Sequence, residues 1–206
     1  MAESNTIIDL SHHNGDVDLG RAKAAGILGV IQKATQGTGY KDPTFDANRE
    51  QAIQAGLLFG AYHFGTGDDG VAQAEHFLSV ANGAKDLLVL DFEGNTQGPS
   101  MTLEEARAFV IHIREKAGRY PGFYSGHYVK ELLGNTHDPV LSQCWFWLAQ
   151  YGPTAVVPVN WDKWMLWQYT DGGLGPEPHS VDGVGRCDRY KFNGDADMLR
   201  RFWTQA

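Results

Sequence analysis

The amino-acid sequence predicts an α/β protein whose single domain, residues 1–206, is a barrel of eight strands. Three observations lead to this fold. The length of 206 residues suits one domain with a sizeable core, and no internal repeat or Pro/Ser-rich linker divides it. Short apolar runs alternate with helical segments, which is typical of a parallel sheet covered by helices. The helical segments become scarce after about residue 120, so we expect helices to be missing after the later strands.

Each predicted strand is a short run rich in β-branched or aromatic residues. Eight such candidates favour a closed barrel over an open, doubly wound sheet. Neither a GxGxxG motif nor a P-loop follows the first run, which disfavours a nucleotide-binding sheet. In chain order the runs are TIIDL, GVIQKAT, LLFGAYHF, LLVLDF, PGFYSG, CWFWLAQ, MLWQYT and GRCDRYKF.

Helices are predicted from their end signals and apolar stripes. The first long one has Asp42 as its expected N-cap, Pro43 as its first residue and Gly56 at its end. Another begins with the capping-box pattern TLEE at 102–105, and a final helix is expected near 195–204. The expected stripes are positions 71, 74, 78 and 81, closed by Gly83, and positions 103, 106, 110, 113 and 117.

Composition excludes several classes of function. A formal charge of −8 provides no basic surface for nucleic acid or for an acidic membrane. No apolar stretch is long enough to span a bilayer, and the start MAESNTIIDL lacks the features of a signal peptide. Cys144 and Cys187 are expected to be buried free thiols, and the histidines lack metal-binding spacing. We therefore expect no metal, no cofactor, and a monomer.

Two carboxylates stand at the end of the most apolar strand. Alternate strand residues share a face, so Val89, Asp91 and Glu93 point one way, with the two acidic Cβ atoms roughly 6–7 Å apart. Asp9 ends the first strand, and Asp188 lies in the last strand-like segment. Active sites of barrels form where the carboxyl ends of the strands meet, so we expect these acids to gather in one mouth.

A single acid at a strand end is commonly a turn former or a helix cap, and that interpretation suffices for Asp9 or Asp188 alone. Asp91 and Glu93 together are harder to explain structurally, because two close carboxylates raise each other's pKa and cost stability. A general acid paired with a second carboxylate is the arrangement used in glycoside hydrolysis. A Mg²⁺ or Ca²⁺ site is the competing interpretation, but the surrounding residues are aromatic rather than basic.

Aromatic residues cluster near the same strand ends. Sugar rings present apolar C–H faces that pack on aromatic rings, while their hydroxyls meet polar groups. Strand parity allows only some of these residues to face the mouth, so we expect Trp145 and Trp167 to pack in the core. The expected substrate-binding residues are Tyr62, Tyr124, Trp147 and Gln168.

Several motifs occur in an order that resembles glycoside hydrolase family 25, the muramidase-type lysozymes. The resemblance covers roughly residues 6 to 194, and its most specific parts are the D-x-E of LLVLDFEG, the D-x-S of IIDLSHHNG and the W-Q-Y of LWQYTD. It implies an irregular TIM-like (β/α) barrel and cleavage of the β-1,4 bond between N-acetylmuramic acid and N-acetylglucosamine in peptidoglycan. Other matching segments are IQKATQGTGYKDPTFDAN, GAYHFG, GFYSG, FWLAQYG and DRYKFNG.

The resemblance also implies roles for the four acids. Glu93 would be the general acid, and Asp91 would stabilise the developing positive charge or orient the substrate N-acetyl group. Asp9 and Asp188 would tune this pair and hold the sugar or a water. The chain departs from the family pattern at Gln36, where members often have Glu, and after Asp188, where Arg-Tyr stands in place of x-Asn.

Alternatives remain at this stage. A catalytically silent glycan-binding barrel or an enzyme acting on a chitin-like polymer would share the fold, and the stereochemical outcome is open between retention, inversion and substrate assistance. The Gly- and Pro-rich segment 172–186 is expected to be a mobile rim. The expected partner is the peptidoglycan glycan strand, reached outside the cytoplasm by phage-type lysis or another export route.

Overall fold

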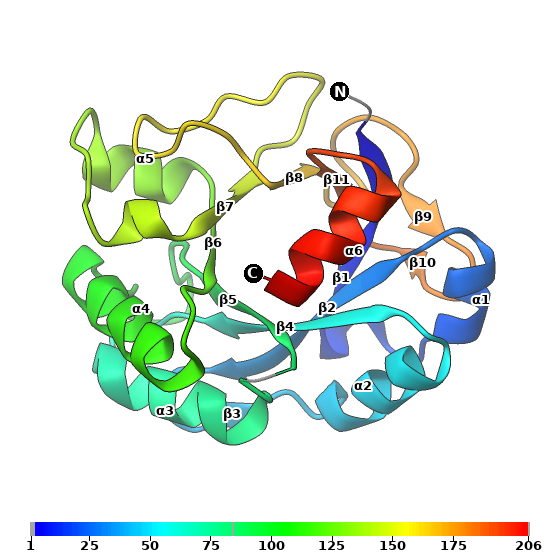
Figure 1. Ribbon diagram of the computed structural model, residues 1–206, viewed down its shortest axis with the longest axis horizontal. Helices are drawn as coiled ribbons and strands as arrows, with labels where there is room; N and C mark the ends of the chain where they lie inside the picture. Colours follow the sequence, from blue (N-terminus) through cyan, green and yellow to red (C-terminus); the bar gives the residue numbers. More distant parts are fainter. Residues whose placement is uncertain (1–2, 84, 206) are drawn as a thin grey trace.

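The computed structural model describes residues 3–83 and 85–205, which form a closed barrel with helices around its outside (Figure 1). The wall has the strand order β1-β11-β8-β7-β6-β5-β4-β2, and β1 pairs with β2 to close the ring. The predicted eight-strand barrel is confirmed. Its strands are β1 (Ser4–Leu10), β2 (Gly29–Gln36), β4 (Leu58–Phe64), β5 (Leu87–Asp91), β6 (Gly122–Ser125), β7 (Trp145–Ala149), β8 (Leu166–Thr170) and β11 (Arg189–Phe192).

The last strand corrects the expectation of a parallel ring. β11 pairs antiparallel with both β1 and β8, whereas the other neighbours around the ring are parallel. No helix lies between β8 and β11, and an antiparallel neighbour needs no helical crossover. Asp188 precedes β11 instead of ending it, yet the reversal brings it to the rim where the parallel strands end. Two short strands were not predicted: β3 (Tyr40–Lys41) and β9 (Ser180–Val181). The predicted run GRCDRYKF, residues 185–192, is divided into β10 (Gly185–Arg186), which pairs with β9, and β11.

The long helices cover the strands of the first half of the chain, as expected. The capping box is confirmed: the Thr102 side chain accepts from the Glu105 N–H, and Glu105 accepts from the Thr102 N–H. After residue 120 the helices are short until the C-terminal one. The helices are α1 (Leu19–Ala24), α2 (Phe45–Gln54), α3 (Gly70–Val80), α4 (Leu103–Ala117), α5 (His127–Leu133) and α6 (Ala196–Gln205), with 3₁₀ turns η1 (His12–Asn14) and η2 (Leu141–Gln143).

Two local predictions were wrong. Asp42 does not cap α2, whose N-cap residue is Thr44. The buried Asp42 carboxylate instead accepts hydrogen bonds from the Thr44 N–H and hydroxyl and from the His12 N–H, so it ties the loop after β1 to the start of α2. In α3 the buried face is shifted, with Ala74 and Phe77 buried and Val71 exposed, and the helix ends before Gly83.

The apolar core has two layers that follow the strand parity. Leu87 and Val89 point into the barrel, whereas Leu88, Leu90 and Phe92 pack between the barrel and the helices. The inward layer fills the interior with residues from all around the ring, among them Ile7, Ile31, Leu166 and Phe192. The predicted alternation of residues 89–92 is therefore observed.

Helix α6 closes the end of the barrel at which the parallel strands begin (Figure 1). The Trp203 indole N–H donates to the Phe59 carbonyl at 2.8 Å, and its ring covers Gly29 at the start of β2. A Cβ at Gly29 would lie 2.9 Å from that ring, so only glycine allows this close approach. Since α6 occupies this end, the mouth at the opposite end is the open one.

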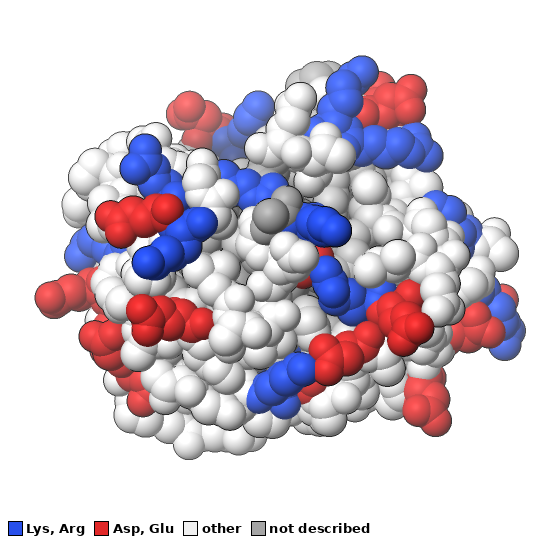
Figure 2. Space-filling view, turned by 60° about the horizontal axis from the view of Figure 1, so that its bottom comes forward, with Lys and Arg blue, Asp and Glu red and all other residues white. Residues whose placement is uncertain are grey.

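The two cysteines agree with the prediction of buried free thiols. Cys144 and Cys187 are buried and free. Acidic and basic side chains are interspersed on the face shown in Figure 2, without a continuous basic area. Among the described residues, no helix combines the length and apolar character required to cross a bilayer. The residues Met1 and Ala2, on which the signal-peptide prediction partly rests, lie outside the described ranges.

Candidate active site

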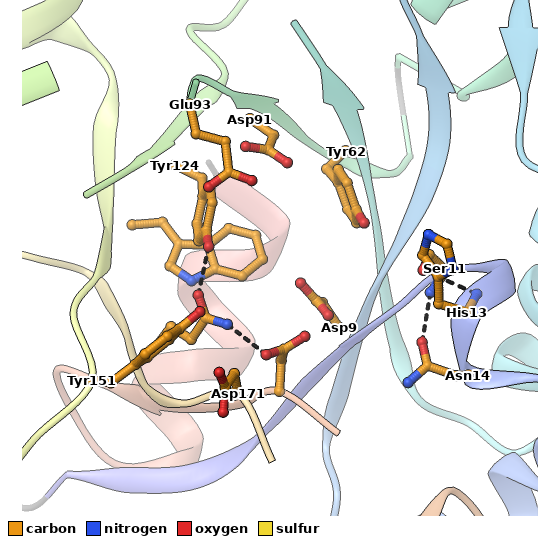
Figure 3. Close-up of a pocket in the computed structure, with 13 residues that line it drawn as sticks. Asp9, Ser11, His13, Asn14, Tyr62, Asp91, Glu93, Tyr124, Tyr151 and Asp171 are labelled. Atoms are coloured by element: carbon orange, nitrogen blue, oxygen red, sulfur yellow. Dashed lines mark hydrogen bonds between the residues drawn. The ribbon is translucent and has the colours of Figure 1, made fainter. Parts of the chain in front are cut away.

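A cavity of about 350 Å³ opens at the mouth of the barrel, and every one of the predicted site residues lines it (Figure 3). Glu93 and Asp91 lie together on one side, with Asp9 and Asp171 across the cavity from them. The complete lining is Asp9, Ser11, His13, Asn14, Tyr62, Asp91, Glu93, Tyr124, Trp147, Tyr151, Gln168, Asp171 and Asp188. The structure thus brings acids from three distant segments into one site.

Strand geometry places each acid at this end of the barrel. Asp9 is the penultimate residue of β1, and Asp91 is the last residue of β5. Glu93 follows two residues later on the same face, beyond the buried Phe92. Asp188 directly precedes the reversed strand β11. Because side chains alternate between the two faces of a strand, the inward-facing apolar residues of β1 are followed on the same face by Asp9, and those of β5 by Asp91 and Glu93.

Asp91 is held in an environment that disfavours its charge. The side chain is buried, and one carboxylate oxygen, Oδ1, has no hydrogen-bond partner among the described residues. Burial, and next the adjacent Glu93 carboxylate, hold the pKa of Asp91 well above its usual value, while the Lys33 ammonium opposes this shift. A proton on this pair of carboxyls is therefore stabilised at pH values where an exposed acid would have lost it.

The other three acids are shifted in the same direction. Burial, then the charge of Asp188, raises the pKa of Glu93, and Lys33 partly offsets it. Burial and the neighbouring Asp188 carboxylate raise the pKa of Asp9 strongly. Asp188 itself is raised by burial, although hydrogen bonds to its carboxylate lower the pKa in part. The four carboxyls share one cavity and do not all ionise easily, so the site retains protons.

A hydrogen-bond relay fixes the wall between β6 and β11. The Tyr124 hydroxyl donates to the Gln168 oxygen at 2.6 Å, and the Gln168 amide donates to Asp188 Oδ1 at 2.6 Å. Because the oxygen of Gln168 accepts from Tyr124, its NH₂ group must face Asp188. Trp147 supports this wall from below, with edge contacts to Tyr124 and to Tyr190 at ring-centroid distances of 4.9 and 4.7 Å.

The aromatic residues divide as expected between core and mouth. Trp167 packs in the outer layer, where its indole N–H donates to the Gln150 carbonyl. Trp145 packs against Phe202 of α6, at the closed end of the barrel. Both core predictions are confirmed. Trp147 lines the mouth but is only 1% exposed, so most of its ring supports neighbouring side chains.

Sequence reasoning missed several lining residues. Tyr151 and Asp171 follow β7 and β8 and belong to loops, for which strand parity makes no prediction. Tyr151 is 43% exposed, so its ring is available to a ligand. His13 and Asn14 come from the 3₁₀ turn after β1. The inward-facing Lys33 could have been found, because a lysine inside the apolar run GVIQKAT is unusual in a buried strand.

Two further cavities border Glu93 and extend the site into a groove. One, of about 670 Å³, lies beside His13, Lys33 and the loop 94–97. The other, of about 380 Å³, lies beside Tyr124, Tyr151 and α5. Glu93 lines all three cavities, so a chain-like ligand lying in the groove would pass this side chain. In the part of the chain that the structure describes, no group of three or more His, Cys, Asp or Glu side chains could hold a metal ion.

Comparison with known proteins agrees with this geometry. The family model for glycosyl hydrolases family 25 matches residues 8–177. Lysozyme M1 of Streptomyces globisporus is 35% identical over 208 residues, covering 93% of this chain and 69% of that protein. The crystal structure of a bacterial lysozyme from Streptomyces coelicolor aligns with a TM-score of 0.84 at 32% identity, covering 98% and 97% of the two chains. A family GH25 lysozyme from Aspergillus fumigatus also aligns at 0.84, with 29% identity and coverage of 98% and 100%.

Proposed function

The chain belongs to glycosyl hydrolases family 25 and is a glycoside hydrolase of the lysozyme type; from this premise we propose that it cleaves the β-1,4 bond between N-acetylmuramic acid and N-acetylglucosamine in peptidoglycan. The groove through three adjoining cavities suits a polymer rather than a small glycoside. The enzyme then acts on the bacterial cell wall, outside the cytoplasm.

One observation carries the proposal: Glu93 stands where all three cavities meet, and its raised pKa favours the protonated form. Cleavage of a glycosidic bond needs a proton for the leaving oxygen, and a carboxyl group that keeps its proton near the working pH can supply it. We assign Glu93 the role of this general acid. In a retaining mechanism the same group, now a carboxylate, would take a proton from the incoming water; in an inverting one a second carboxylate would do so.

Asp91 faces the same cavity and becomes charged more readily when Glu93 is protonated, because the two carboxyls repel each other only when both are ionised. Its carboxylate then stabilises the positive charge that develops on the sugar, or orients the N-acetyl group as an internal nucleophile. Asp9 and Asp188 lie on the other wall and would hold the sugar or a water. Gln168 fixes the position of Asp188 through its donated hydrogen bond.

The aromatic residues provide the surface for the sugar rings. Tyr62 and Tyr124 line the central cavity, and the more exposed Tyr151 stands between that cavity and the one beside α5. Apolar C–H faces of a sugar would lie on these rings, while hydroxyls meet the carboxylates and Gln168.

Glu93→Gln tests the assignment, because it keeps the shape of the side chain and removes the proton. The expected result is loss of turbidity clearance of peptidoglycan suspensions, with retention of binding to the insoluble glycan. A silent glycan-binding barrel would give wild type and variant the same behaviour, with no clearance by either. Equal clearance by both would mean that Glu93 is not the acid. NMR of the anomer released first would decide between retention and inversion.

A further inference from the structure

The cavity of about 670 Å³ beside Glu93 contains a buried cation without an ion pair. Lys33 is 9% exposed, and the structure shows no salt bridge to it within the described ranges. Its Nζ donates to the neutral Gln36 Oε1 at 2.7 Å, and it lies 5.6 and 5.0 Å from the ring centroids of Tyr40 and Phe64. Neither an amide oxygen nor an aromatic face neutralises an ammonium charge. The carboxyls of Asp91, Asp42 and Glu93 act on Lys33 from beyond salt-bridge distance, and their combined effect is smaller than that of burial, which lowers the pKa of Lys33. Lysine is rarely buried unless a counter-charge is present.

Charge is unevenly divided between the two adjoining cavities. Five carboxyl side chains and no lysine or arginine line the central cavity. In the neighbouring cavity Glu93 is the one acid at the boundary, and Lys33, His12 and His13 lie on the wall. The central cavity repels an anion, whereas its neighbour offers a positive charge in a partly dehydrated setting, where electrostatic attraction is strong.

We propose that Lys33 forms a carboxylate-binding subsite in this second cavity, which holds the anionic substituent of muramic acid and directs the glycan across Glu93. This inference rests on the proposed function. Muramic acid differs from N-acetylglucosamine by a lactyl ether whose carboxyl is either free or extended by a peptide that ends in carboxylates. A chitin-like polymer has neither group, so Lys33 would make the enzyme selective for peptidoglycan.

The position of Lys33 in the barrel also supports a carboxylate-binding subsite. β2 places its side chain inward, two residues after Ile31 of the inner core. Gln36 holds the ammonium by one hydrogen bond and leaves its other N–H groups for a ligand. Asn95 and Gln97 from the loop after β5 also line the cavity. The Asn95 amide is used within the loop, by the Pro99 carbonyl and the Gln97 N–H, so the Gln97 side-chain amide is the group that can bind the rest of the substituent.

Lys33→Met removes the charge and keeps the length of the side chain. Three substrates separate the sources of the anion: glycan strands with peptide stems, strands stripped to free lactyl carboxylates, and stripped strands whose carboxylates are converted to neutral methylamides. The expected result is a rise in KM of about 10- to 100-fold on a charged substrate, the range for a lost hydrogen bond to a charged group, and less than about twofold on the neutral strands. Loss on the stem-bearing strands alone assigns the stem carboxylate, and loss on the stripped strands assigns the lactyl group.

Equal losses on charged and neutral strands would overturn the inference, because they would mean that Lys33 acts through Asp91 and Glu93 instead. Lys33→Arg should restore much of the affinity for charged strands. Lys191→Met is the control for the loss of a lysine charge outside the groove, since Lys191 also lies over aromatic rings, 4.9 Å from Trp167, although it pairs with Glu3 at 3.0 Å. Thermal unfolding of each variant verifies the fold.

Direct binding separates this inference from the proposed function. Calorimetric titration of the stem-bearing strands and of the stripped strands into Glu93→Gln and into Glu93→Gln/Lys33→Met needs no turnover. Weaker binding by the double variant supports the subsite even if the wild type fails to cleave, a failure that would overturn only the proposed function. Equal binding of both kinds of strand by the two variants overturns the subsite.

Discussion

Glu93→Gln should abolish activity and at the same time stabilise the protein at neutral pH. The pKa of Glu93 is raised by burial and by Asp188. A carboxyl with a raised pKa binds more protons in the folded state than in the unfolded state. The free energy of unfolding therefore falls as the pH rises from about 4.3, the ordinary value for Glu, through the raised value. At a pH above the raised pKa of Glu93, the ionised Glu93 carboxylate destabilises the folded state, and a neutral glutamine does not.

The magnitude follows from the linkage relation. Each unit by which the pKa is raised corresponds to about 1.4 kcal/mol of unfolding free energy at a pH above the window. For a domain of this size, 1 kcal/mol shifts Tm by about 2–4 °C, so one unit predicts a gain of about 3–6 °C at pH 7.5. Below about pH 4 Glu93 is protonated in both states and the gain should vanish. Loss of a general acid typically lowers kcat by about 10²- to 10⁴-fold.

Differential scanning calorimetry at pH 3.5 and pH 7.5, together with kcat on peptidoglycan, checks both parts. Glu115→Gln is the control, because that carboxylate is exposed on α4 and should leave Tm and kcat nearly unchanged. If Glu93→Gln gained the same Tm at both pH values, or had a lower Tm than the wild type at pH 7.5, the ionised Glu93 carboxylate would not be what destabilises the folded protein. Undiminished kcat would remove Glu93 from the chemistry.

Three more outcomes are expected. Gln168→Leu removes the donor to Asp188 and leaves the Tyr124 hydroxyl without its acceptor. Because the hydrogen bond from Gln168 lowers the pKa of Asp188, that pKa should rise in the variant. The acidic limb of the pH–rate profile should then move to higher pH, which a profile measured from pH 3 to 8 would detect. The pKa of the Cys187 thiol is raised to about 12 by burial, so it should not react with a thiol reagent until the protein is unfolded, and labelling of the native protein at pH 8 would contradict its burial. Phe92→Ala leaves a cavity between barrel and helices and should lower the free energy of unfolding by about 3–5 kcal/mol in urea titrations, with no change if the packing there is loose.

Strand parity explains why much of the site could be predicted. A buried strand offers two faces, so the alternation of Val89, Leu90, Asp91, Phe92 and Glu93 defines which side chains reach the interior. The number of apolar runs then predicts ring closure, which brings strand ends together whatever their separation in sequence. Both inferences need only the local pattern.

Where geometry depends on loops or on chain direction, the pattern does not suffice. Asp188 reaches the mouth because β11 is reversed, and the sequence was interpreted as a strand running the other way, with the acid at its far end. Asp42 has a helix-capping signature, but its carboxylate is used for His12 across the fold, a tertiary contact that no local signal reveals. Tyr151 and Asp171 were missed because their positions depend on loop conformation.

Closure of the ring by β11 also has a consequence for biosynthesis. The last strand of this barrel, β11, is synthesised about 180 residues after β1. The edge of β1 that pairs with β11 therefore stays unpaired while the rest of the chain is made. The nascent polypeptide therefore passes through an open sheet whose apolar interior is uncovered until α6 arrives. Chaperone occupancy or a low growth temperature should raise the recombinant yield more than any change at the catalytic mouth.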